Sequence, residues 1–117
     1  MIPLLAKKQY LKNYAFVQAK LERLCRMQQM NTDRNGHYET AIHEVIRLRD
    51  GIEAAVENME DESEKEVLAQ KYLCGKSFSD CAESMHYSQR QIERIHKKAL
   101  EHFSPSPEQL GAFRIPS

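Results

Sequence analysis

The sequence is poor in residues that break or cross-link a chain. Only four glycines and four prolines occur in 117 residues, and the segment 4–104 contains no proline. Sandwiches and barrels need many tight turns, so this scarcity favours helices. The three cysteines are an odd set, too sparse for a small disulfide-stapled secreted domain. We therefore predict an all-α protein with reduced thiols in the cytoplasm.

The chain also lacks a net charge and a long apolar run. Seventeen basic and seventeen acidic side chains cancel, so the total charge identifies no partner. No apolar segment approaches the roughly 18 residues that span a membrane, and the first residues do not resemble a signal peptide, so no membrane partner is expected. The charges are nevertheless segregated. Residues 1–30 carry six basic and one acidic side chain, whereas residues 51–70 carry one basic and seven acidic ones.

Two long segments have the apolar spacing of amphipathic helices. They cover about 4–29 and 38–59, and turn-forming residues at 31–36 separate them. An antiparallel helical hairpin over residues 1–60 is the simplest arrangement, and it would place Lys7, Lys8 and Lys12 near Glu57, Glu60 and Asp61. Because two helices make a thin core, we expect this hairpin to act as a spacer and to form a homodimer through the N-terminal helices. The predicted stripes are Tyr10, Tyr14, Val17, Leu21 and Leu24 on the first helix, and Tyr38, Ile42, Val45, Ile52, Val56 and Met59 on the second.

Three serines mark helix starts further along the chain. Ser63, Ser77 and Ser88 each stand three residues before an acidic or amide side chain, as N-cap residues do. They predict short helices over about 63–73, 77–85 and 88–103. We assign residues 61–103 to one small domain. Residues 104–117 contain three of the prolines and no periodicity, so we expect a flexible tail.

The second and third of these short helices have the spacing of a helix-turn-helix. A small residue, Ala82, stands where the second helix would cross the first, and Tyr87 would fill the turn. His86 occupies a turn position where glycine is usual, and a positive φ there would cost free energy. The predicted core of the motif is Phe78, Cys81, Ala82, Met85, Tyr87, Ile92 and Ile95.

The opposite face of segment 88–103 carries side chains suited to DNA. Arginine can bind guanine with two hydrogen bonds, glutamine can bind adenine in the same way, and glutamate can accept from cytosine. The candidate base contacts are Gln89, Arg90, Glu93 and Arg94. The candidate phosphate contacts are Lys76, Ser77, Tyr87, Ser88, Lys97 and Lys98.

Taken together, residues 63–103 resemble region 4 of sigma-70-type factors, and most closely the small phage-encoded regulators of the ArpU and RinA kind. The resemblance is carried by Glu66–Leu68, Lys71–Phe78, Cys81–Ile92, Arg94–His96 and Ala99–Leu100. It implies control of phage or prophage genes, often late ones, through DNA near a promoter in the bacterial nucleoid. It also implies that Gln89, Arg90, Glu93, Arg94 and Lys97 face the major groove. Because 117 residues leave no room for the other regions of a sigma factor, we do not expect a complete one.

Two other functions stay open at this point. A small terminase-like DNA-packaging subunit would also join a helix-turn-helix to an oligomerising helical part. A region-4-like module could instead bind RNA polymerase rather than DNA. No catalytic constellation or phosphate-binding loop is recognisable, so we expect neither an enzyme nor a cofactor. The spacing of Cys74, Cys81 and His86 does not match common zinc sites, so no metal is expected, and His96 is expected to be a hydrogen-bonded core residue.

Overall fold

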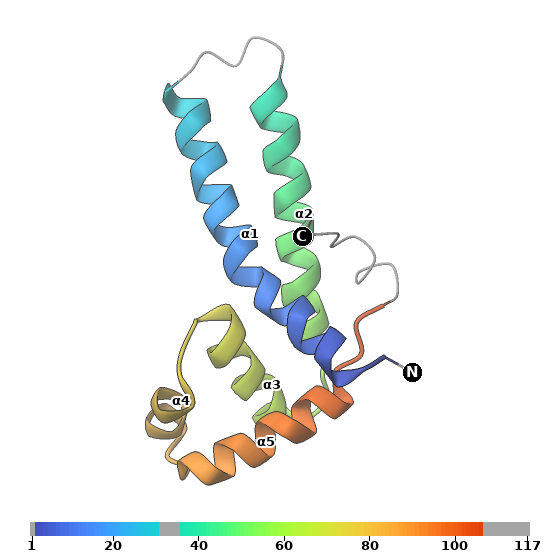
Figure 1. Ribbon diagram of the computed structural model, residues 1–117, viewed down its shortest axis with the longest axis vertical. Coiled ribbons are helices and arrows are strands. Elements are labelled where there is room, and N and C mark those ends of the chain that lie inside the picture. Colours follow the sequence, from blue (N-terminus) through green and yellow to red (C-terminus); the bar gives the residue numbers. More distant parts are fainter. Residues whose placement is uncertain (1, 31–35, 107–117) are drawn as a thin grey trace.

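The computed structural model describes residues 2–30 and 36–106, and these residues form helices and no strand (Figure 1). The prediction of an all-α protein is confirmed. The elements are α1 (Leu4–Met30), α2 (His37–Glu57), α3 (Glu62–Leu68), the π-helical turn η1 (Ala69–Leu73), α4 (Phe78–Met85) and α5 (Gln89–His102).

The two long helices α1 and α2 lie side by side and run in opposite directions (Figure 1). Their predicted apolar stripes are where the packing occurs: Val17 and Leu24 of α1 form a buried cluster with Ile42 and Val45 of α2. Nearer the other helices, the hydroxyl of Tyr14 donates a 2.6 Å hydrogen bond to the Glu53 carboxylate. The predicted turn lies largely outside the described residues, of which Gly36 is the first after the gap.

The shorter helices pack across one end of this pair and share a core with it. Tyr10 and Leu11 of α1, Val56 of α2, Leu68 of α3 and Phe103 belong to one continuous buried cluster. The two predicted parts, 1–60 and 61–103, therefore share one hydrophobic core. α5 contacts both α1 and α3. The long pair projects beyond the shorter helices at its other end (Figure 1).

Two of the three predicted helix starts are confirmed, and one is corrected. The hydroxyl oxygens of Ser77 and Ser88 accept backbone N–H bonds from the residues three positions later. The first short helix, however, is capped by Asp61, whose carboxylate accepts from the N–H of Glu64 at 3.0 Å. Ser63 therefore lies inside the helix. A carboxylate is the better acceptor at a helix N-terminus, since it also interacts favourably with the helix dipole.

The segment 62–73 is continuous, as predicted, but its last turn is widened. Residues Ala69–Leu73 form a π-helical turn that ends where the N–H of Cys74 donates to the carbonyl of Ala69. Gly75 follows with a φ of 71°, which glycine adopts without steric cost. The widened turn brings Tyr72 to the buried side, where it contacts α5.

After α5 the chain leaves helical geometry at Phe103, whose side chain is fully buried. The next residues up to Ser106 are not helical, and Pro105 among them is buried. The remainder of the predicted tail, 107–117, lies outside the described residues.

Candidate nucleic-acid interface

The candidate interface begins with the short helix α4, which Ser77 caps with a 3.1 Å hydrogen bond from the N–H of Asp80. α4 ends at Met85, and the chain reverses within three residues before α5 begins. The N–H groups of His86 and Tyr87 both donate to the carbonyl of Ala82. These bonds give the carbonyl of Ala82, near the end of α4, its hydrogen-bond partners and keep the turn compact.

The turn depends on His86, which has a φ of 60° and a ψ of 39°. Among the described residues, it is the only non-glycine residue with a positive φ. The expected strain at this position is therefore present. It persists because the bonds to Ala82 on one side and the Ser88 cap on the other determine the path of the chain.

The structure brings together all seven side chains that the sequence placed in the motif core. Cys81, Ala82 and Ile92 are buried with Val67 of α3, and the other predicted residues pack around them. Val67 was not among the predicted residues. Burial also raises the pKa of the Cys81 thiol, which keeps it protonated and apolar in this core. The half-buried members of the cluster are Phe78, Met85, Tyr87 and Ile95.

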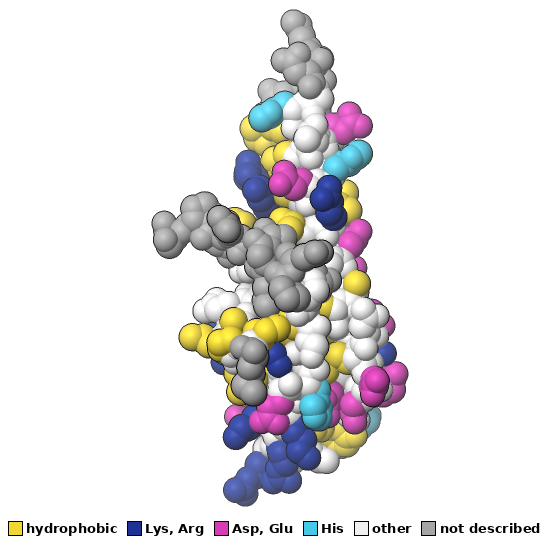
Figure 2. Space-filling view, turned by 90° about the vertical axis from the view of Figure 1, so that its right-hand side faces the viewer, with side chains coloured by type: hydrophobic (Ala, Val, Ile, Leu, Met, Phe, Trp, Pro, Cys, Tyr) yellow, Lys and Arg dark blue, Asp and Glu magenta, His cyan; other side chains and the backbone are white. Residues whose placement is uncertain are grey.

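With its apolar side committed to this cluster, α5 turns its polar side to solvent. All four candidate base contacts are exposed, and within the described residues none of them forms a side-chain hydrogen bond or ion pair. Figure 2 shows Lys and Arg side chains gathered at the lower end of the molecule, where Figure 1 draws α5. The four exposed residues are Gln89, Arg90, Glu93 and Arg94.

The candidate phosphate contacts differ in solvent exposure and in the hydrogen bonds that they already form. Lys97 and Lys98 are exposed, whereas Lys76 and Tyr87 are half-buried. Ser77 and Ser88 already accept backbone hydrogen bonds, yet a hydroxyl that accepts can still donate its own proton. Ser88 also stands at the N-terminus of a helix of 14 residues, where the backbone N–H groups favour an anion.

Behind the exposed face, His96 joins α5 to the preceding helices. Its Nε2 lies 2.7 Å from the Tyr72 hydroxyl. Its ring is edge-on to the Phe78 ring, with 5.0 Å between the two ring centres. Burial, and next the charges of Lys71 and Lys8, lower the pKa of His96 to about 4. The imidazole is therefore neutral at physiological pH, and the prediction of a hydrogen-bonded core histidine is confirmed. The Lys71 ammonium lies 4.2 Å from the centre of the Phe78 ring.

The contact that sequence reasoning missed is at the other end of α5. Lys7 is buried, and its ammonium donates to the carbonyls of Leu100 and Glu101 at 3.0 Å each. The helical hairpin predicted from the sequence would instead place this lysine near carboxylates. Its position three residues before Tyr10, in line with the apolar stripe, was the available signal of burial.

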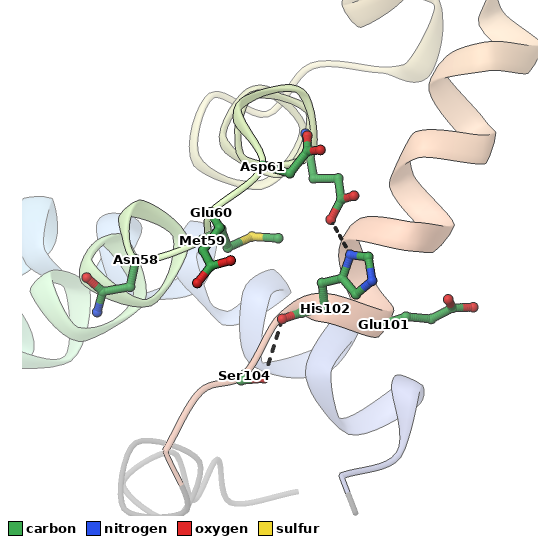
Figure 3. Close-up of a pocket in the computed structure, with 8 residues that line it drawn as sticks. Asn58, Met59, Glu60, Asp61, Glu101, His102 and Ser104 are labelled. Atoms are coloured by element: carbon green, nitrogen blue, oxygen red, sulfur yellow. Dashed lines mark hydrogen bonds and ion pairs between the residues drawn. The ribbon is translucent and has the colours of Figure 1, made fainter.

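A second candidate site is a hollow beside the end of α5, with a volume of about 620 Å³ (Figure 3). Four of its eight lining residues are acidic, and one of them, Glu64, is held by a 2.7 Å bond to His102. Across residues 2–30 and 36–106, no group of three or more His, Cys, Asp or Glu side chains is arranged to hold a metal ion. Cys74, Cys81 and His86 thus form no such group. The lining residues are Asn58, Met59, Glu60, Asp61, Glu64, Glu101, His102 and Ser104.

Comparison with protein-family models, with curated proteins and with solved structures finds no match to this chain. Within the described residues, no helix is both long enough and apolar enough to cross a membrane.

Proposed function

We propose that this protein is a sequence-specific DNA-binding transcription regulator that inserts α5 into the major groove. One observation carries the proposal. α5 buries one side against α4, to which it is joined by a tight turn where His86 has a left-handed backbone conformation. On its other side, the side chains of Gln89, Arg90, Glu93 and Arg94 are exposed and have no hydrogen-bond or ion-pair partner in the described chain. A helix-turn-helix presents its second helix in this way.

The exposed residues suit direct base reading. Arg90 and Arg94 stand one helical turn apart near the start of α5, and Gln89 flanks them. Forked arginine and amide side chains discriminate bases in the major groove, whereas lysines such as Lys97 anchor the phosphates. In this proposal residues 61–103 form the DNA-binding part, α1 and α2 form a helical hairpin that acts as a spacer, and the protein is not an enzyme.

The resemblance to region 4 of sigma-70-type factors and to phage regulators of the ArpU and RinA kind narrows the proposal. It suggests activation of phage or prophage genes, with RNA polymerase as a second partner in the bacterial cytoplasm. Cys81 stands where an aliphatic residue is usual in that family, and its burial keeps the equivalent apolar role.

The DNA-binding surface can be tested by removing equal charge from two places. Lys97→Ala with Lys98→Ala removes two positive charges from α5, and Lys20→Ala with Arg26→Ala removes two from exposed positions on α1. We expect the α5 pair to weaken binding to a mixed-sequence duplex about tenfold and to reduce the salt slope by about 2, as each lost phosphate contact reduces it by about 1. The α1 pair should change binding less than about twofold. Equal effects from both pairs would reject α5 as the binding surface.

A further inference from the structure

Three lysines from different elements form a row beside the helix-turn-helix. Lys8 belongs to α1, Lys71 to the π-helical turn η1, and Lys76 directly precedes the cap of α4. All three are half-buried, and within the described residues none of their side chains forms a hydrogen bond or an ion pair. A lysine ammonium without an acidic partner is available to an anion from outside the chain, and phosphate is an anion that lysine binds well.

The middle of this lysine row is fixed by contacts with both helices of the motif. The Lys71 ammonium lies 4.2 Å from the centre of the Phe78 ring on α4. The Phe78 ring in turn stands edge-on to the ring of His96 on α5. Lys71 therefore lies where η1, α4 and α5 come together.

The two ends of the row lie on either side of Lys71. Lys7 bonds the end of α5, and this contact holds the start of α1, with Lys8, against that helix (Figure 1). Burial, and next the charges of Lys71 and Lys8, lower the pKa of His96, so both lysines lie on the α5 side.

Lys76 lies on the α4 side. Burial raises the pKa of the Cys81 thiol, and the charges of Lys71 and Lys76 oppose that rise. The carboxylate of Asp80, in the first turn of α4, is the acidic group that acts on the same thiol. The row thus leads from α1 through η1 to the N-terminal end of α4.

The row also borders the exposed face of α5. At about 100° per residue, His96 lies about 60° from Glu93 and about 100° from Lys97 around the helix. His96 therefore marks the edge of the face that carries the candidate DNA contacts. Because Lys8 and Lys71 lie close to His96, they continue the positive surface of α5 beyond this edge.

We infer that Lys8, Lys71 and Lys76 contact phosphates of one DNA strand while α5 lies in the major groove. The first helix of a helix-turn-helix crosses the DNA backbone, and Lys76 stands at the N-terminal end of that helix. Lys71 and Lys8 extend the contact onto η1 and α1, so the long helices take part in DNA binding. This contact rests on the proposed function, since it requires α5 in the groove.

The test removes two charges from the row and leaves the candidate base contacts unchanged. Lys8→Gln with Lys71→Gln is compared with Lys20→Gln with Arg26→Gln, which removes two charges from exposed positions farther along α1. Binding to a mixed-sequence duplex is measured at several salt concentrations. The row variant should bind about tenfold more weakly and reduce the salt slope by about 2, because each lost phosphate contact reduces it by about 1. The control should change binding less than about twofold.

Lys8→Arg with Lys71→Arg separates charge from packing. Arginine keeps the positive charge, so this variant should retain the salt slope of the unchanged protein, and all variants should keep their helical circular dichroism. If the row variant behaves like the control, or if the arginine variant loses as much of the slope as the glutamine variant, the row does not contact phosphates although α5 still binds DNA. If the unchanged protein binds no DNA, the proposed function is rejected and the phosphate contact with it.

Discussion

Lys7, near the start of α1, hydrogen-bonds the carbonyl of Leu100 near the end of α5, with 3.0 Å between Nζ and the oxygen. The same ammonium also bonds the carbonyl of Glu101. A helix leaves its last carbonyls without partners, and a positive charge there is favourable. This contact therefore fixes the orientation of the proposed recognition helix relative to the long helices.

Replacing Lys7 with methionine removes the charge and both hydrogen bonds but keeps most of the side-chain volume. We expect the free energy of unfolding to fall by about 1–3 kcal/mol, because the buried carbonyl of Leu100 and the part-buried carbonyl of Glu101 lose their partner. Urea unfolding followed by circular dichroism measures the change. Lys20→Met, at an exposed position of the same helix, should stay within about 0.5 kcal/mol. Equal effects from the two variants would show that the Lys7 bonds contribute nothing.

His86→Gly should stabilise the protein by about 1 kcal/mol, since glycine adopts the observed φ of 60° without the steric cost that a side chain meets. The gain is limited by the greater freedom of glycine in the unfolded chain. Thermal unfolding would show a higher Tm. Glu83→Gly, inside α4, should lower it. A lower Tm for His86→Gly would show that the positive φ of His86 costs less than the imidazole and the stiffer unfolded chain contribute to stability.

Stability should depend on the protonation of His96. The ordinary pKa is 6.5, and in the folded protein burial lowers it to about 4. Between these values the unfolded chain binds the proton and the folded chain does not, so stability falls as the pH decreases from about 6.5 to 4. The loss is on the order of 3 kcal/mol.

The variant His96→Gln separates this effect from the titration of carboxylates, because the amide can still accept from Tyr72 and does not titrate. Urea midpoints at several pH values should fall less steeply for the variant than for the unchanged protein. Parallel curves for the two proteins would show that His96 is protonated equally in the folded and unfolded states.

Asp61→Ala should cost about 1 kcal/mol of unfolding free energy, the usual loss when a helix cap is removed. Ser63→Ala should cost less, because Ser63 lies within the helix and caps nothing. The comparison can be made by urea unfolding at neutral pH. A larger loss for Ser63→Ala would restore the helix start that the sequence pattern alone suggested.

Local features were largely predictable from the sequence. Apolar spacing located the helices to within about two residues, because burial of one face governs where a helix forms. Ser77 and Ser88 were recognised as caps since each cap is a contact within four residues. Asp61 was missed because two plausible acceptors stand close together, and only the backbone geometry decides between them.

Contacts between distant segments could not be predicted in this way. The bond between Lys7 and Leu100 spans 93 residues, and nothing in local spacing indicates which helix end a buried lysine will meet. The π-helical turn at Ala69–Leu73 likewise has no pattern in the sequence that distinguishes it from an α-helix. The seven residues of the predicted motif core were found together because their spacing within 78–95 already reflects their contacts.

Selection from a pool of random duplexes at near-physiological salt tests whether α5 reads DNA sequence. The unchanged protein should enrich one motif, and Arg94→Ala should lose that enrichment while retaining its fold. Binding without enrichment that weakens steeply with salt would indicate phosphate contacts alone, as a DNA-packaging subunit would make. That result, or the absence of any binding, would rule out sequence reading by α5.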